Sequence, residues 1–164
     1  DAWSGTGDPI KWIQRGKSCE YMSSEVRLEL LFPNKNVCRI NARHDFSGHS
    51  QYNPAHGPMK ANMFGVRDHI AVAGHKHISG HGVLKNPDDG SLCNSFLVAG
   101  YKVFDRFAME RGFRDQHISP GVFTIIDPGL PNTHPDFVTY YWTIEKGVEI
   151  LKYLRSRKTP VHAA

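Results

Sequence analysis

Every second residue is apolar from Val26 to Phe32. A period of two places alternate side chains on one face of an extended chain, so residues 25–33 predict a β-strand. The next residues, PNKN, are typical of a turn. A second alternating stretch follows at residues 37–43 and predicts the returning strand of a hairpin.

Further along the chain, short apolar stretches alternate with loop-like segments, and the last strong pattern is helical. Apolar residues between positions 143 and 158 recur every three or four residues, which predicts a helix of about four turns. Other strands are predicted at 69–74, on both sides of a Pro87–Gly90 turn within 82–103, and at 121–129, and short helices at 9–16, 59–65 and 105–112. We expect one domain, residues 1–164, of the α/β class.

Composition narrows the functional classes. The 164 residues carry a formal net charge of +4, which fits an anionic substrate but does not by itself indicate nucleic-acid binding. No apolar run reaches the roughly 18 residues that a membrane span needs, so no membrane association is predicted. The three cysteines, Cys19, Cys38 and Cys93, are isolated, which favours reduced thiols in a cytoplasmic protein.

Histidine is the unusual component, because seven of the ten histidines lie in the second quarter of the chain. His44 directly follows one predicted strand, and His75 and His77 directly follow another. Parallel strands of an α/β sheet present their carboxyl ends at one edge, so these three imidazoles are expected to meet there. Imidazole is a common metal ligand, and Gly74 is expected to let the backbone turn close to a bound ion.

Neighbouring residues have weaker assignments. Asp45 either binds or orients an imidazole beside the metal, or caps its own loop. His49 and His56 contact a phosphate or brace the loop that carries them. His69 opens a strand at its far end and is expected to be structural, whereas His81 is expected to lie beside the ligands or in solvent.

Three stretches resemble motifs of the calcineurin-like metallophosphoesterases, in particular their phage and bacterial members. AVAGHKH resembles the last motif of that family, an apolar strand followed by Gly-His-x-His. INARHDFSGHS resembles the preceding motif, a strand that ends on one metal-binding histidine. DAWSG resembles the end of a Gly-Asn-His-Asp motif, of which Asp1 is present. The order of the pieces matches, and the resemblance covers residues 1 to about 130.

The resemblance implies a sandwich of two mixed β-sheets flanked by helices, with two divalent metal ions (Mn, Fe or Zn). By analogy, His44 and His75 bind one ion and His77 binds the other. Such ions activate a water and clamp the phosphoryl oxygens of a phosphomonoester or phosphodiester, nucleic-acid ends included. Lys76 and Arg43 are candidates to offset phosphate charge.

The sequence departs from the family in its carboxylate ligands. Before His44, where the family carries them, an Asp-x-His motif and a bridging Asp are absent, and Asp8 has no partner histidine at the right spacing. We therefore expect the C-terminal half of a metallophosphoesterase domain, inactive or nearly so by itself, in which three histidines hold at most a single ion. No residue is assigned a catalytic role, and no oligomeric state is predicted.

Two alternatives remain open. One is a phosphohydrolase of the HD type built around His44 and Asp45, which would be all-helical, against the strand pattern of residues 25–43. The other is a non-catalytic metal-binding or interaction domain in which the histidines form a structural zinc site. Because such sites often include cysteine, Cys38 is a candidate fourth ligand.

Overall fold

The structure, a computed structural model, describes residues 14–18, 20, 22, 24–101, 109–112 and 115–158. Residues 9–13 of the helix expected at 9–16 and residues 105–108 of the helix expected at 105–112 lie outside these residues. Cys19 and Asp8 lie outside them too.

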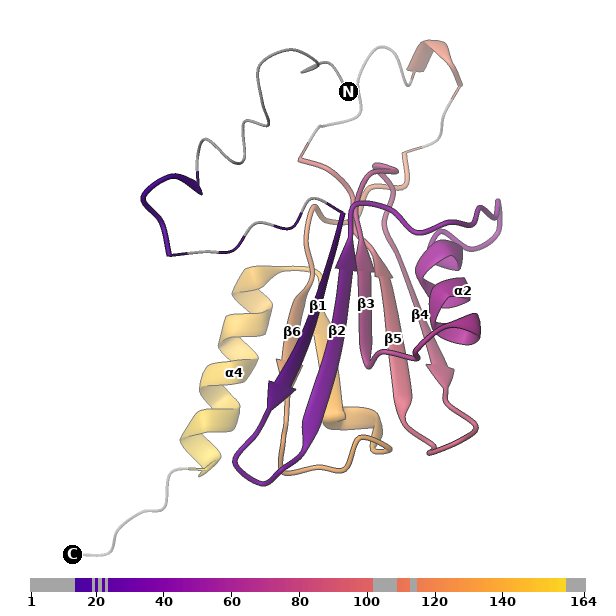
Figure 1. The fold of residues 1–164 in the computed structure, drawn as a ribbon. Coiled ribbons are helices and arrows are strands. Elements are labelled where there is room, and N and C mark those ends of the chain that lie inside the picture. Colours follow the sequence, from indigo (N-terminus) through magenta and orange to yellow (C-terminus); the bar gives the residue numbers. More distant parts are fainter. Residues whose placement is uncertain are drawn as a thin grey trace, which may run out of the picture.

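A mixed five-stranded sheet forms the centre of the described structure, in the order β1-β2-β3-β5-β4 (Figure 1). Its strands are β1 (Glu25–Leu31), β2 (Val37–Arg43), β3 (Ile70–Ala73), β4 (Gly80–Lys85) and β5 (Leu92–Leu97). The inner strands β2, β3 and β5 run parallel to one another, and β1 and β4 pair antiparallel at the two sides. The α/β class and the parallel arrangement of the two histidine-bearing strands are therefore confirmed.

The β1–β2 hairpin forms where alternation predicted it. Leu28 pairs with Ile40 in the antiparallel register, so apolar side chains of both strands share one face of the sheet. At the turn, the Lys35 backbone N–H donates to the Phe32 carbonyl at 2.8 Å, and Lys35 takes a positive φ of 68°. The predicted turn at Pro87–Gly90 likewise joins β4 to β5, and Gly90 there has a φ of 75°.

Helix α2 (His56–Phe64) covers one face of the five-stranded sheet beside β4 and β5 (Figure 1). Beneath this region Phe46, Ala71, Ala73 and Leu97 form a buried apolar cluster. The helix begins three residues before the predicted start, because the many polar residues up to Pro58 made this segment read as loop. Pro58 lies in the first turn of the helix. Proline is tolerated there, since the first backbone N–H groups of a helix have no acceptor within the helix.

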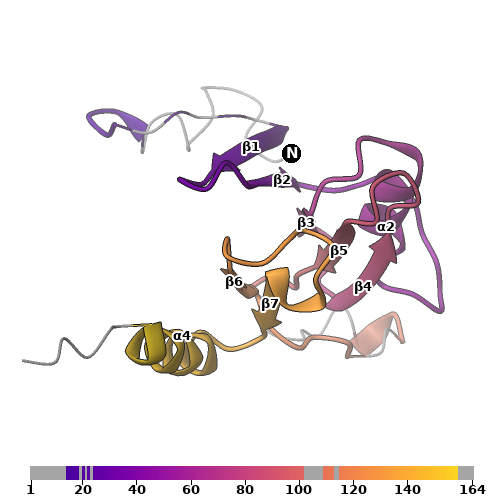
Figure 2. The ribbon, with the colours of Figure 1, turned by 90° about the horizontal axis from the view of Figure 1, so that it is seen from below.

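A two-stranded antiparallel sheet, β6 (Phe123–Ile126) and β7 (Val138–Tyr141), lies against the opposite face of the large sheet (Figure 2). The two sheets share a buried cluster formed by Cys38, Ile70, Phe96, Phe137 and Val138. Helix α4 (Ile144–Lys158), predicted from its periodicity, packs against β6 and β7 on the far side, and a short 3-10 helix, η1 (Pro135–Phe137), leads into β7. The resemblance implied two mixed sheets, but the described strands of the smaller sheet are antiparallel.

Strand β7 had no counterpart among the predicted elements, although its sequence VTYY is rich in β-branched and aromatic residues. The strand-dominated architecture conflicts with the all-helical HD alternative. In the part of the chain that the structure describes, no helix has both the length and the apolar character for a membrane span.

Candidate metal centre

The carboxyl ends of β2, β3 and β5 lie side by side at one edge of the sheet. Arg43 at the end of β2 pairs with Ala73 in β3, and Ala73 pairs with Leu97 in β5. The loops that carry His44, His75 and the residues after β5 therefore leave the sheet together. This is the edge at which ligands bind in open α/β sheets.

His44 and His75 are in direct contact at this edge. Nε2 of His44 lies 2.7 Å from Nδ1 of His75, and the ring centroids are 4.5 Å apart with the ring planes at 68°. Both residues are exposed. Two nitrogens bound to one zinc ion at about 2.1 Å with tetrahedral geometry lie roughly 3.4 Å apart, so this pair is within about 1 Å of that nitrogen–nitrogen distance.

The turn that carries His75 is strained. The Lys76 backbone N–H donates to the Gly74 carbonyl at 2.9 Å, which closes a three-residue turn around His75, whose φ is 68°. His77 also has a positive φ, of 54°. Gly74 itself has no positive φ, and a Cβ there would meet no atom within 4 Å. An unusual backbone conformation was expected at Gly74, but the positive φ angles occur at His75 and His77. A positive φ is energetically unfavourable for these residues because they carry a Cβ.

Lys76 joins the loop after β3 to the loop after β2. Its Nζ donates to the Gly48 carbonyl at 2.8 Å and lies 3.3 Å from Oδ1 of Asp45. The same Asp45 oxygen accepts from the Phe46 backbone N–H at 2.9 Å. Of the two roles predicted for Asp45, the structure shows the loop cap, with Lys76 as its charged partner.

His77 lies on the other side of the turn, against the loop that follows β5. The nearest atoms of its ring are 3.5 Å from the position that a Cβ on Gly100 would take. Nε2 of His117 lies 3.0 Å from the Gly100 carbonyl oxygen, so a fourth histidine reaches this edge. Sequence reasoning gave His117 no role, because it is isolated in the chain and only the folded loop brings it to Gly100.

The remaining predicted residues of this region differ in their surroundings. His49 is exposed, and His56 is the first residue of α2, with its Cδ2 3.1 Å from the place that a Cβ on Gly48 would take. A phosphate contact by either histidine stays a prediction. His69 is buried and its Nδ1 accepts from the Arg39 backbone N–H at 3.0 Å, as expected of a structural residue. Burial lowers the pKa of His69.

The prediction for His81 is wrong. His81 belongs to β4 and lies opposite Phe96, so its ring faces the junction of the two sheets. It stacks on Phe96 at a centroid distance of 4.5 Å and contacts Tyr140 at 4.1 Å, and its Nε2 lies 3.3 Å from Oδ1 of Asn94. This partial burial lowers the pKa of His81.

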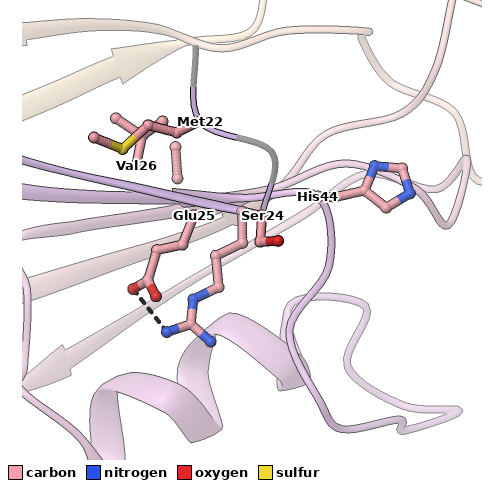
Figure 3. Close-up of a pocket in the computed structure, with 7 residues that line it drawn as sticks. Met22, Ser24, Glu25, Val26 and His44 are labelled. Atoms are coloured by element: carbon pink, nitrogen blue, oxygen red, sulfur yellow. Dashed lines mark ion pairs between the residues drawn. The ribbon is translucent and has the colours of Figure 1, made fainter. Parts of the chain in front are cut away.

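A shallow hollow of about 240 Å³ lies beside His44 on the β1 side (Figure 3). The His44 ring points away from Glu25, which lines this hollow (Figure 3). Oε1 of Glu25 lies 2.6 Å from Arg27 Nε and 2.7 Å from Arg43 Nη2, and these hydrogen bonds hold the pKa of the Glu25 carboxyl below its usual value. The Glu25 carboxylate is thus already paired with two arginines, and the contact between His44 and His75 is separate from it.

The described residues supply two converging imidazoles but not a complete set of ligands. Within the described ranges, no group of three or more His, Cys, Asp or Glu side chains is placed to hold a metal ion. Cys38 lies toward the other end of β2, roughly 20 Å from His44 along an extended strand. It is buried in the core, where desolvation raises the pKa of its thiol to about 11. A zinc site that combines Cys38 with His44 is therefore excluded.

Comparisons with protein-family models, with curated proteins and with solved structures found no match to this chain. The function proposed next therefore rests on the arrangement of the histidines and on the motifs that carry them.

Proposed function

We propose that this chain carries the histidine ligands of a metal-dependent phosphoesterase. In this proposal His44 and His75 bind one divalent ion, Mn, Fe or Zn, and His77 binds a second. The observation that supports it most directly is the 2.7 Å contact between the side-chain nitrogens of His44 and His75 at the carboxyl edge of the parallel strands.

Exposure and strain favour a binding role over a structural one. The two rings lie at the surface, where a mutual hydrogen bond adds only about 1 kcal/mol to stability. The positive φ angles of His75 and His77 each cost of order 1 kcal/mol or more, and such strain concentrates at functional sites. The fold is less stable because it holds these exposed imidazoles in a strained turn, and this is consistent with selection for their ability to bind a metal ion.

Two divalent ions at this edge would supply an activated water and would neutralise phosphoryl oxygens. The contribution of the chain is to present neutral imidazole nitrogens at fixed positions. The nearby cations are paired, Lys76 with Asp45 and Arg43 with Glu25, so a phosphate contact from either one requires exchange of its carboxylate partner.

Carboxylate ligands would come from outside the described residues, because within these ranges no Asp or Glu completes a group of three possible ligands. Glu25 and Asp45 are held by other partners. In the metallophosphoesterases that the motifs resemble, an Asp-x-His motif and a bridging Asp lie upstream. We therefore propose that this chain forms the C-terminal half of such a domain, and that its two sheets belong to a larger sandwich. The substrate class is a phosphomonoester or phosphodiester, nucleic-acid ends included.

The proposal is tested by turnover of p-nitrophenyl phosphate and bis-p-nitrophenyl phosphate with Mn²⁺, in the longest natural form of the protein. His75→Ala and His77→Ala should abolish turnover while the circular dichroism spectrum is retained, and His134→Ala, in the loop before η1, should leave turnover unchanged. Full turnover in both site variants would refute the assignment. If the wild-type protein hydrolyses neither ester but His77→Ala strongly lowers its melting temperature, a structural metal site is the better account.

A further inference from the structure

We propose that Lys76 is a positioning residue that holds the two metal-binding loops in register, an inference that rests on the proposed function. Lys76 lies between His75 and His77 in the Gly-His-x-His stretch. Its amine points toward the loop after β2 and not into solvent. It contacts Gly48 and Asp45 there. The side chain is only 22% exposed, which is low for a lysine on a surface loop.

The strained turn needs an external restraint. Residues with a Cβ leave the left-handed region when nothing holds them there. His75 and His77 flank Lys76, and both have positive φ angles. A side-chain tether at the residue between them restricts rotation of the turn as a unit, and thereby restricts the direction in which the His75 ring points.

The acceptor of this tether is itself fixed. Gly48 has a φ of 137°, and a Cβ at this position would lie 3.1 Å from His56 Cδ2 and 3.3 Å from Gly57 Cα. Gly48 therefore sits directly against the start of α2, which limits how far the loop that carries this carbonyl can move. Lys76 thereby couples the position of the turn that carries His75 to the position of α2.

Asp45 completes the arrangement because it lies next to His44 in the chain. A lysine beside a metal site opposes cation binding unless its charge is compensated. The Asp45 carboxylate, 3.3 Å from Lys76 Nζ, provides this compensation. The link thus ties the residue after His44 to the residue after His75, and these two histidines are the pair whose nitrogens are 2.7 Å apart.

The test is titration of the full chain with Co²⁺, followed by the visible absorption of the bound ion. Lys76→Met removes the amine and keeps much of the side-chain length, and Lys76→Arg keeps a cation that can reach both oxygens. Lys85→Met, at the end of β4, is the matched control. Melting temperatures of the metal-free variants are measured alongside, so that loss of fold is separated from loss of the site.

Lys76→Met should weaken Co²⁺ binding about tenfold to a hundredfold and change the visible spectrum, as expected when a group that orients ligands is removed. Lys76→Arg should restore most of the affinity, and Lys85→Met should match the wild type. Wild-type Co²⁺ affinity in Lys76→Met, whatever its melting temperature, would overturn the role of Lys76 alone. A wild-type chain that binds no Co²⁺ would overturn the proposed metal site together with it.

Discussion

His44 and His75 are 31 residues apart in the sequence, and their side-chain nitrogens are 2.7 Å apart in the fold. The contact arises because each residue follows the end of a strand, and these strands, β2 and β3, are parallel neighbours in register. Strand pairing places the loops, and the strained turn around His75 points its ring at His44. The site thus depends on the packing of the strands beneath it, on Gly48 in the loop after β2, and on the contacts of Lys76 with Gly48 and Asp45.

The junction of the two sheets should depend on Phe137, which is buried against Phe96 and Cys38. Phe137→Ala should lower the free energy of unfolding by about 3–5 kcal/mol, because a large core side chain is replaced by a cavity. Urea denaturation measures the loss. Phe64→Ala is the matched control, since Phe64 is 78% exposed, and its effect should stay within about 0.5 kcal/mol. Equal, small losses in both variants would mean that the sheets do not pack on each other as described.

Gly48 and Gly74 should respond differently to alanine. At Gly48 a Cβ meets the start of α2 and the φ of 137° is unfavourable for alanine, so Gly48→Ala should lower the free energy of unfolding by roughly 1–3 kcal/mol. At Gly74 neither obstacle exists, and Gly74→Ala should be neutral or stabilise by about 0.4–1 kcal/mol. Thermal denaturation of both variants at pH 7.5 checks the difference. A Gly74→Ala variant as unstable as Gly48→Ala would show that the turn is not described correctly.

Stability should fall in mild acid partly because of His81. Burial lowers the pKa of folded His81, so between that value and about 6.5 the unfolded chain binds more protons than the folded one. The contribution of neutral His81 is therefore complete above about pH 6.5 and is lost as the pH falls through the folded pKa. His81→Phe keeps an aromatic ring against Phe96 and Tyr140 but cannot be protonated, so its unfolding free energy should vary less between pH 7.5 and 5.

The measurement is denaturant unfolding at both pH values, with the exposed His49→Gln as control. His69, whose pKa is also lowered by burial, should sustain part of the pH dependence in His81→Phe. An unchanged pH dependence in His81→Phe, equal to that of His49→Gln, would mean that His81 is not buried between the sheets.

The sequence predicted those features that depend on local periodicity. Alternation located the β1–β2 hairpin, and the positions of His44, His75 and His77 after apolar strands predicted that these three side chains meet. The structure brings His44 and His75 into contact, whereas His77 lies against Gly100. Features that depend on tertiary contacts were not predictable in the same way. His81 reads as a loop residue until the pairing of β4 with β5 places it opposite Phe96, and His117 reaches Gly100 only through the folded loop. The positive φ angles of His75 and His77 run against residue preference, so no propensity argument would assign them.

The central claim is that His44 and His75 bind one metal ion together. The most direct measurement is calorimetric titration of the chain with Zn²⁺ at pH 7.5, for the wild type, His44→Ala, His75→Ala and the exposed His49→Ala on the same loop as His44. We predict that the wild type and His49→Ala bind Zn²⁺ with equal affinity and that each of the other two variants loses this binding. Wild-type affinity in both His44→Ala and His75→Ala would contradict the account.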